Sequence, residues 1–305
     1  MLKSGAEVDK TDRQGLTSLA LAVQEGHVGP MRMLLAHGAD VDRCNENGTV
    51  PLFLAAGAGD EAAVLVLLEH GASVDLRKKE TGATPLHAAV RGGSVDVVKV
   101  LLAKGANPNF VDYDKETPLV AAVRGGVKEG PASPVKPGNP KRRSNFPEHL
   151  RDALVGILLA AGARPDERAD AGDTALTAAA RRGSTRLARR LLEAGADATL
   201  RDGFGNPPLF LCASLRGPAG APHLGPQQDL AELLLAHGAQ VDGADARGAT
   251  ALHAAVYYGR LGLARLFLAH GARAASCLFR GQVLSFASRL SGSFSSFYVW
   301  FPRPV

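Results

Sequence analysis

Imidazole groups are the most versatile chemical groups of this chain, because a histidine can ligate a metal ion or transfer a proton near neutral pH. The sequence has nine histidines. Four of them stand directly before a glycine in repeated "HGA" segments, at His37, His70, His237 and His270. A polar or positive group there favours the dipole of a helix end. Two more, His87 and His253, follow "TPL" and "TAL". Six of the nine thus recur at fixed places of repeated motifs, and we expect no catalytic or metal-binding histidine.

Other motifs of enzymes are also missing from the sequence. The segment "GNPKRRS" lacks the glycine-to-lysine spacing of a phosphate-binding loop, and no nucleophile elbow or HExxH zinc motif occurs. The cysteines, Cys44, Cys212 and Cys277, are widely separated, which indicates reduced thiols and an intracellular compartment. We therefore predict a protein that is not an enzyme, needs no cofactor or metal, and has no small-molecule substrate.

The formal charge of +5 is unevenly distributed along the chain. Residues 246–305 contribute +7 and residues 127–150 contribute +3, so the rest of the chain carries −5. Because a phosphate-binding surface should be a basic face of the fold itself, this distribution disfavours nucleic acid as a partner. The sequence has no apolar stretch long enough to span a membrane, so we expect no membrane association.

A repeat with a period of 33 residues organises these side chains. Its best copy is "ETGATPLHAAVRGGSVDVVKVLLAKGANPNF", residues 80–110. The glycine of its "KGA" recurs at Gly5, Gly38, Gly71, Gly105, Gly162, Gly195, Gly238 and Gly271. The leucine of its "TPLH" recurs at Leu19, Leu52, Leu86, Leu119, Leu176, Leu209 and Leu252. Two glycine intervals are longer, at 57 and 43 residues, and both expansions fall inside a repeat, between the leucine and the glycine.

Each repeat carries the signals of two short helices. Threonines that can cap a first helix are Thr17, Thr84, Thr117, Thr174 and Thr250. Prolines suited to its first position are Pro51, Pro85, Pro118 and Pro208. Val97 and Leu101 form an i, i+4 apolar pair on a second helix, which the glycine of "GA" ends. A further glycine, two residues before the threonine position, suits a hairpin turn, but Lys115 replaces it in the fourth repeat and puts that turn in doubt.

The period and the "TPLH" motif resemble the ankyrin repeat over about residues 1–275. The resemblance implies an all-α fold, a solenoid of stacked helix-turn-helix units with β-hairpin tips. It also implies that His87 and His253 form hydrogen bonds between hairpin and helix. We expect a half repeat and seven repeats in residues 1–275, with an insert at about 127–149 in repeat four and a shorter insert at about 216–227 in repeat six. Residues 276–305 lie outside the pattern and are expected to form a disordered tail. Because neither end matches a polar capping repeat, we expect a fragment or splice variant of a longer family member.

The first insert is rich in proline and contains a basic triplet, Lys141, Arg142 and Arg143, which resembles a weak nuclear import signal. Ser144 follows the triplet and is a candidate kinase target. The alternative is a tolerated loop, because lengthening a turn from about five to about thirty residues costs only about 1.5 kcal/mol. We expect a cytoplasmic protein, which also enters the nucleus if the triplet is recognised.

Arginines at the ends of the first helices are the main candidates for partner binding. The position seven residues after the capping threonine is Arg91, Arg124 and Arg181 in three adjacent repeats, with Arg182 beside the last. A regular stack would align these residues into a basic ladder that steers an acidic protein partner. The alternative is that the long side chains only cover helix ends.

Three aromatic residues and one asparagine complete the candidates. Tyr113 and Phe204 occupy expected hairpin tips, and aromatic residues are common anchors in binding hot spots. Tyr257 takes the arginine position in the last repeat. The resemblance places Asn109 at a hairpin position that an asparagine hydroxylase modifies in many ankyrin proteins, although Pro108 replaces the usual valine.

Together these features predict a monomeric scaffold or adaptor that binds another protein on the concave face implied by the resemblance. Three alternatives stay open at this point. The chain could be the recognition arm of a ubiquitin-ligase adaptor that lacks its docking box. It could be the cytosolic ankyrin segment of a larger channel or enzyme, or it could bind nucleic acid.

Overall fold

The computed structural model describes residues 7–13, 15–125, 146–169, 172–215, 225–273, 278–279 and 282–283. Fourteen α-helices in these ranges form seven consecutive pairs. The first helices of the pairs are α1 (Ser18–Gln24), α3 (Pro51–Ala58), α5 (Pro85–Gly92), α7 (Pro118–Arg124), α9 (Ala175–Arg182), α11 (Pro208–Ser214) and α13 (Ala251–Tyr257). The second helices are α2 (Val28–Ala36), α4 (Glu61–Glu69), α6 (Val95–Ala103), α8 (Glu148–Ala160), α10 (Thr185–Glu193), α12 (Gly225–Ala236) and α14 (Leu261–Ala269).

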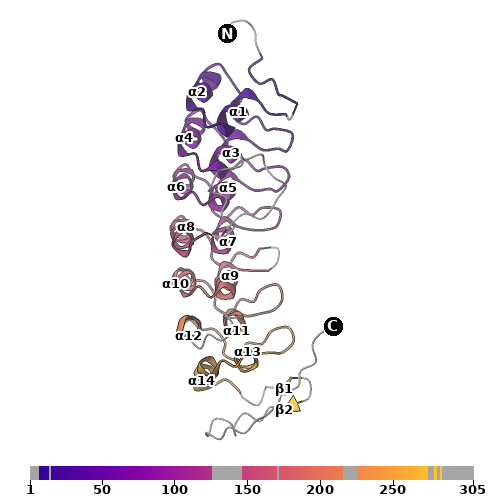
Figure 1. Ribbon diagram of the computed structural model, residues 1–305, viewed down its shortest axis with the longest axis vertical. Coiled ribbons are helices and arrows are strands. Elements are labelled where there is room, and N and C mark those ends of the chain that lie inside the picture. Colours follow the sequence, from indigo (N-terminus) through magenta and orange to yellow (C-terminus); the bar gives the residue numbers. More distant parts are fainter. Residues whose placement is uncertain are drawn as a thin grey trace.

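The seven pairs stack into an elongated solenoid. The first helices form one row and the second helices another, and the loops between pairs project on the side of the first helices (Figure 1). Each first helix contacts the first helix of the next pair, and each second helix contacts the next second helix. One continuous apolar core runs through the stack, since small and aliphatic side chains meet at every junction between pairs. The predicted all-α solenoid is confirmed.

The first helices begin where the sequence predicts. Thr17, Thr117 and Thr174 each accept a hydrogen bond from the backbone amide three residues later, at 3.1 to 3.2 Å. Thr84 and Thr250 do so within capping boxes, in which the third helical residue is a histidine. Such a cap stabilises a helix by about 1 kcal/mol. Proline is the first residue of α3, α5, α7 and α11, where no amide hydrogen bond is lost.

The second helices bury an apolar face and end at the predicted glycines. In α6, the side chains of Val97, Val98 and Leu101 are fully buried. The glycine that follows each second helix has a left-handed backbone, with φ between 83° and 90° at Gly38, Gly71, Gly105, Gly162, Gly195, Gly238 and Gly271. A residue with a β-carbon is strained in this conformation, so the glycines set the point at which the chain turns toward the next repeat.

The fourth hairpin, residues 112–116, keeps its turn despite the missing glycine. Lys115 adopts φ 52° and is the one non-glycine residue with positive φ in the part of the chain that the structure describes. Its amide donates to the carbonyl of Asp112 at 2.9 Å, as Gly48 donates to Asn45 at 2.9 Å in the second hairpin. The doubt about this turn is therefore resolved, at a strain of about 1 kcal/mol in the lysine backbone.

The loops between pairs contain little strand. In the described ranges, only isolated bridges join Thr11 to Thr17 and Ala244 to Thr250. The strands β1 (Leu278–Phe279) and β2 (Gln282–Val283) pair antiparallel within the segment expected to be a tail. The rest of that segment after residue 273 lies outside the described residues. No described helix has the length and hydropathy required to cross a bilayer.

The register predicts the two inserts between α7 and α8 and between α11 and α12, which are separated by residues 125–147 and 215–224. Residues 126–145, which include most of the first insert, lie outside the described residues, and α8 begins at Glu148, one residue before the predicted end of the insert at 149. Phe146 is already buried and packs against the position of Gly93. In the shorter insert, 216–224 lie outside the described residues, and α12 begins at Gly225.

Candidate functional site

The arginines of the predicted ladder do lie in register. Arg91 and Arg124 stand in the last turns of α5 and α7, and Arg181 stands in the last turn of α9. Each side chain reaches a carboxylate of the hairpin before the following first helix. Arg124 and Arg181 also reach a carboxylate of the hairpin before their own helix. The charge of these carboxylates determines what the row can bind.

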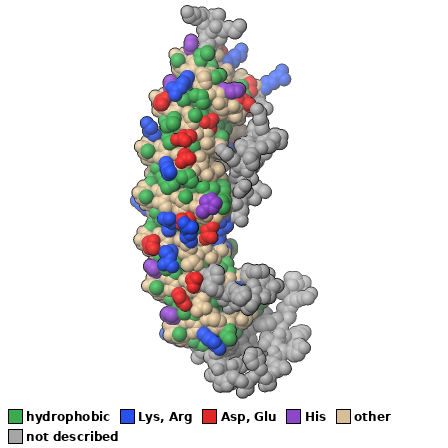
Figure 2. All heavy atoms as spheres, turned by 60° about the vertical axis from the view of Figure 1, so that its left-hand side comes forward, with side chains coloured by type: hydrophobic (Ala, Val, Ile, Leu, Met, Phe, Trp, Pro, Cys, Tyr) green, Lys and Arg blue, Asp and Glu red, His purple; other side chains and the backbone are tan. Residues whose placement is uncertain are grey.

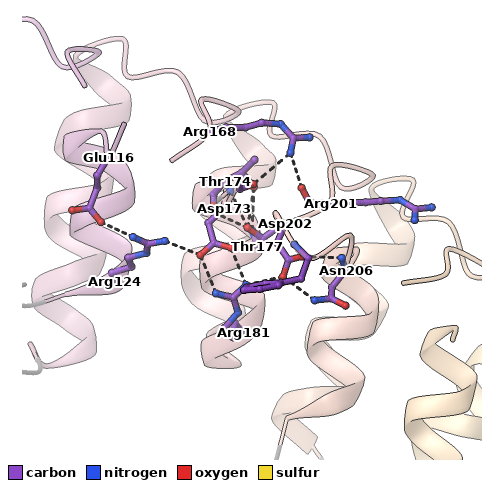
Figure 3. A network of polar contacts seen from close by, with 12 residues as sticks. Glu116, Arg124, Arg168, Asp173, Thr174, Thr177, Arg181, Arg201, Asp202 and Asn206 are labelled. Carbon is purple, nitrogen blue, oxygen red and sulfur yellow. Dashed lines mark hydrogen bonds and ion pairs between the residues drawn. The ribbon is translucent and has the colours of Figure 1, made fainter. Parts of the chain in front are cut away.

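The three arginines and four carboxylates form one continuous series of ion pairs. Arg91 contacts Asp112 at 2.5 Å and Glu116 at 2.8 Å. Arg124 then joins Glu116 at 2.8 Å to Asp173 at 2.7 Å (Figure 3). Arg181 joins Asp173, through two hydrogen bonds of 2.8 and 2.9 Å, to Asp202 at 2.7 Å. We call this series the ion chain; its members are Asp112, Arg91, Glu116, Arg124, Asp173, Arg181 and Asp202.

The ion chain is buried on its acidic side. Its four carboxylate side chains are at most 3% exposed, whereas those of Arg91, Arg124 and Arg181 are 17%, 31% and 43% exposed. Four negative and three positive groups leave a net charge of −1. The expectation of a free basic ladder is therefore wrong in its charge, because the sequence argument counted the arginines and not the carboxylates that neutralise them. A role of these arginines in partner binding stays a prediction.

Local sequence explains why the carboxylates lie there. Glu116 and Asp173 immediately precede the capping threonines of α7 and α9, where other repeats have Leu16, Thr49 or Ala83. The segments "ETP" and "DTA" were thus a visible signal that the charge count along the first helices missed. Burial works against the charged form of Arg91, but its hydrogen bonds to Glu116 and Asp112 outweigh this effect, and the pKa of Arg91 is raised.

His87 joins the helix to the next hairpin, as the resemblance implies. Its Nδ1 accepts from the amide of Thr84 at 3.2 Å, and its Nε2 donates to the carbonyl of Glu116 at 3.0 Å. Burial, followed by the charge of Arg91, lowers the pKa of His87 to about 4. The ring is therefore neutral at physiological pH and serves as a hydrogen-bonded link between two repeats.

The histidines before the cap glycines also have structural bonds. The Nδ1 atom of each lies 2.8 to 2.9 Å from the carbonyl oxygen four residues earlier, in His37, His70, His237 and His270. Each ring thus donates to a carbonyl near the end of its own helix, where helical partners run out. Within the described ranges, no group of three or more histidine, cysteine, aspartate or glutamate side chains is arranged to hold a metal ion.

The aromatic candidates are among the most exposed large side chains. Tyr113 is 63%, Tyr257 64% and Phe204 70% exposed. Tyr113 and Phe204 lie at the tips of the fourth and sixth hairpins, as predicted. Tyr257 instead ends α13 and packs edge-on against Tyr258, with ring centroids 4.9 Å apart. Tyr113 and Phe204 therefore share the hairpin side of the solenoid, and Tyr257 lies at a turn between two helices.

A second row of arginines, which the sequence argument missed, lies on the hairpins themselves. We call Arg77, Arg168 and Arg201 the hairpin arginines. Each donates to a glycine carbonyl of its own hairpin, namely Gly82, Gly172 and Gly205. Each also donates to a carbonyl of the following hairpin, namely Val111, Arg201 and Ala244. Their shared place, directly before the first residue of the hairpin turn, could have revealed them.

The two rows of arginines differ in their partners. Figure 3 shows Arg124 and Arg181 reaching the carboxylates of Glu116, Asp173 and Asp202, while Arg168 bonds to backbone on the hairpin side. None of the hairpin arginines forms an ion pair with a described carboxylate. All three are exposed. Their charges are therefore available to an outside partner.

The remaining candidates have individual outcomes. Arg182 is exposed and donates to the carbonyl of Arg124 at 3.0 Å. The side chain of Asn109 donates to Gly162 at 3.0 Å and accepts from the amide of Arg164 at 2.8 Å, so its amide group is held between two repeats. Modification of Asn109 stays a prediction. The basic triplet Lys141, Arg142 and Arg143, and the candidate kinase target Ser144, lie outside the described residues.

The opposite face of the molecule has a mixed charge. On the face formed by the second helices, basic and acidic side chains alternate along the stack (Figure 2). Arg32 pairs with Glu69 at 3.0 Å there, and Arg186 pairs with Asp152 at 2.7 Å. The hairpin arginines and the exposed aromatic tips of Tyr113 and Phe204 thus lie together on the hairpin side.

Comparison with known proteins agrees with this architecture. Models of ankyrin repeats match residues 1–78 (three copies), 81–113, 171–203 and 224–268 (many copies). No curated protein sequence matches the chain. Among solved structures, an ankyrin repeat domain from Acinetobacter baumannii AYE is 26% identical with a TM-score of 0.60, covering 73% of this chain and 98% of that one.

Two further solved structures are similar. The human ASB11 ankyrin repeat domain is 27% identical with a TM-score of 0.57, covering 78% of this chain and 90% of that one. The ankyrin repeat domain of Bcl-3, described as a unique member of the IkappaB protein family, is 24% identical with a TM-score of 0.59, covering 77% and 88% of the two chains. This last likeness supports the fold alone. With family models matching more than half of its length, the chain belongs to the ankyrin-repeat family.

Proposed function

We propose that this chain is a protein-binding solenoid that acts as a scaffold or adaptor without catalysis of its own, and that its partner docks on the hairpin side. The observation that carries the proposal is the exposure of Tyr113 and Phe204, 63% and 70%, at hairpin tips. Large aromatic side chains cost solubility on a free surface and are enriched where proteins bind one another. Ankyrin repeats are in general protein–protein interaction modules.

The use of the titratable groups inside the fold supports a role in binding. The buried carboxylates hold arginines of the ion chain, and His87 links two repeats. The thiol of Cys212 is buried, which raises its pKa to about 12, so it is a poor nucleophile. These groups stabilise the stack, so their chemistry serves the fold.

Proximity labelling in cells tests the proposal. The bait is the full chain, compared with a tip variant (Tyr113→Ser with Phe204→Ser) and with an outer-face control (Met33→Ser with Leu65→Ser), which removes exposed apolar groups from α2 and α4. Cytoplasmic and nuclear fractions are examined separately, because we propose a cytoplasmic protein with nuclear entry as an alternative.

We expect a set of labelled proteins that the tip variant loses and the outer-face control keeps. Circular dichroism confirms that both variants fold. An identical labelled set for the tip variant and the intact chain would refute docking on the hairpin tips.

A further inference from the structure

The hairpin side carries positive charge that the fold leaves unneutralised. The hairpin arginines bond to backbone carbonyls, and each guanidinium has five N–H donors, of which one or two are used. Arg168 and Arg201 use only Nη1. Donors and charge thus remain at hairpins three, five and six.

The carboxylates near these arginines are occupied elsewhere. Asp202 follows Arg201 in sequence, but its side chain pairs with Arg181 at 2.7 Å. Glu167 precedes Arg168 and pairs with Arg164 at 3.2 Å. Next to Arg201 along the stack, Asp245 accepts amides of its own hairpin at 2.7 and 2.9 Å. The hairpin arginines therefore lie among acids that already have partners.

Apolar groups interrupt the row at the fourth hairpin. Val111 takes the place of the arginine there, and its carbonyl accepts from Arg77. The guanidinium of Arg77 lies 5.9 Å from the ring centroid of Phe110 and 5.8 Å from that of Tyr113. In sequence order the surface is thus positive at hairpin three, aromatic at hairpin four and positive at hairpins five and six. Phe204 stands at the tip of hairpin six.

We propose that the hairpin arginines, with Tyr113 and Phe204, bind an extended acidic segment of the partner protein. Carboxylates of the segment lie opposite Arg77, Arg168 and Arg201, and an apolar side chain between them packs on Tyr113. This inference rests on the proposed function and names the partner's chemistry. Hairpins three to six span three steps of about 8–10 Å between stacked helices, which an extended peptide of about ten residues covers.

Acidic protein fits this side better than nucleic acid does. Asp75 and Asp166 stand two residues before Arg77 and Arg168 at the base of the same hairpins, and Asp42 takes this place at hairpin two. Each accepts a backbone amide from the following repeat. A phosphate backbone carries a charge at every nucleotide and would meet these carboxylates as well as the arginines. A peptide can place its carboxylates only where the arginines are.

Fluorescence anisotropy with defined probes tests the inference. The probe is a labelled peptide of about twelve residues with glutamate at every third position and a central phenylalanine. Companion probes replace glutamate by glutamine, or phenylalanine by alanine, and a single-stranded DNA of about the same length serves as the polyanion. We expect the glutamate peptide to bind the full chain at low salt, the glutamine peptide and the DNA to bind at least about tenfold more weakly, and binding to fall in about 0.5 M salt.

Two triple variants locate the binding surface. The first replaces Arg77, Arg168 and Arg201 by glutamine, and the control replaces Arg32, Arg189 and Arg265 of the opposite face, with the same loss of charge. We expect the first to weaken peptide binding about tenfold or more and the control to change it less than about twofold. If the first triple variant does not fold, Arg201→Gln and Arg189→Gln form the matched pair, with about a threefold effect expected for Arg201→Gln alone.

Tyr113→Ser provides a separate readout. In the intact chain the phenylalanine probe should bind more tightly than the alanine probe, and the variant should lose this difference. Equal loss of binding in the two triple variants, or tighter binding of the DNA than of the peptide, would overturn the inference. The proposed function would then still be decided by proximity labelling, because a partner lost only by the tip variant requires no acidic segment.

Discussion

Asp173 is the central link of the ion chain, and its replacement tests whether the chain stabilises the stack. Its carboxylate is 2% exposed and accepts hydrogen bonds from Arg124 at 2.7 Å and from Arg181 at 2.8 and 2.9 Å. Asp173→Asn keeps the shape and removes the charge. Two opposite charges about 4 Å apart attract by about 4 kcal/mol at an effective dielectric constant of about 20. Desolvation and the partial exposure of both arginines reduce this value.

We expect Asp173→Asn to lower the free energy of unfolding by about 2–3 kcal/mol, because hydrogen bonds to charged groups contribute about 1.5–3 kcal/mol each and asparagine keeps part of one. For a stack of this size, that corresponds to a fall in Tm of about 5–10 °C. In a repeat protein the loss falls on one interface, so the urea unfolding curve should also broaden as the parts before and after Asp173 uncouple. Circular dichroism during thermal and urea unfolding measures both effects.

Glu167→Gln is the matched control, because Glu167 belongs to the same repeat and forms an exposed pair with Arg164. Its removal should change the free energy of unfolding by less than about 0.5 kcal/mol. Equal Tm values for Asp173→Asn and Glu167→Gln would show that the ion chain contributes nothing beyond a surface pair and would refute the reasoning.

Three further perturbations have expected outcomes. Because the folded pKa of His87 is about 4, against 6.5 for the free side chain, the unfolded state binds the extra proton first, and stability is lost as pH falls from about 6.5 through about 4. Over this window the free energy of unfolding of His87→Gln, measured by urea titration, should therefore fall by up to about 3 kcal/mol less than that of the intact chain. An equal pH slope for the two proteins would contradict the assignment. Lys115→Gly should raise the free energy of unfolding by about 0.5–1 kcal/mol, because φ 52° is strained for lysine. A lower Tm of this variant in thermal unfolding would show that contacts of the lysine side chain outweigh the strain in its backbone. Because burial raises the pKa of the Cys212 thiol to about 12, Cys212 should react with a thiol reagent only when the chain unfolds, as measured by mass spectrometry. Rapid labelling of the native chain would contradict the burial of this thiol.

Local features of the fold could be predicted because their causes are local. A capping threonine, a proline at a first helical position and a glycine with positive φ each act within one turn of backbone, as at Thr174, Pro118 and Gly195. The register of the repeat then places Arg91, Arg124 and Arg181 in one row. The turn at Lys115 shows the limit of this argument, because tertiary context holds a lysine in a conformation that the sequence assigns to glycine.

The charge of the candidate site could not be predicted from the same register. Arg124 meets Asp173 across 49 positions of sequence, which include the first insert, so the pairing exists only once the repeats have stacked. The repeat register alone therefore points to arginines whose charge is neutralised in the fold. The hairpin arginines were overlooked for the converse reason, because their bonds to carbonyls of the next hairpin, such as that of Arg168 to Arg201, depend on the distance between stacked turns.

The most direct test compares the two rows of arginines in one experiment. Nitrogen–proton NMR of the arginine Nε groups, recorded while the glutamate peptide is added to the full chain, reports each guanidinium separately. We predict that the signals of Arg77, Arg168 and Arg201 shift with the peptide concentration, and that those of Arg91, Arg124 and Arg181 stay in place. Shifts confined to Arg91, Arg124 and Arg181 would contradict it, because the neutralised row would then be the one that meets the partner.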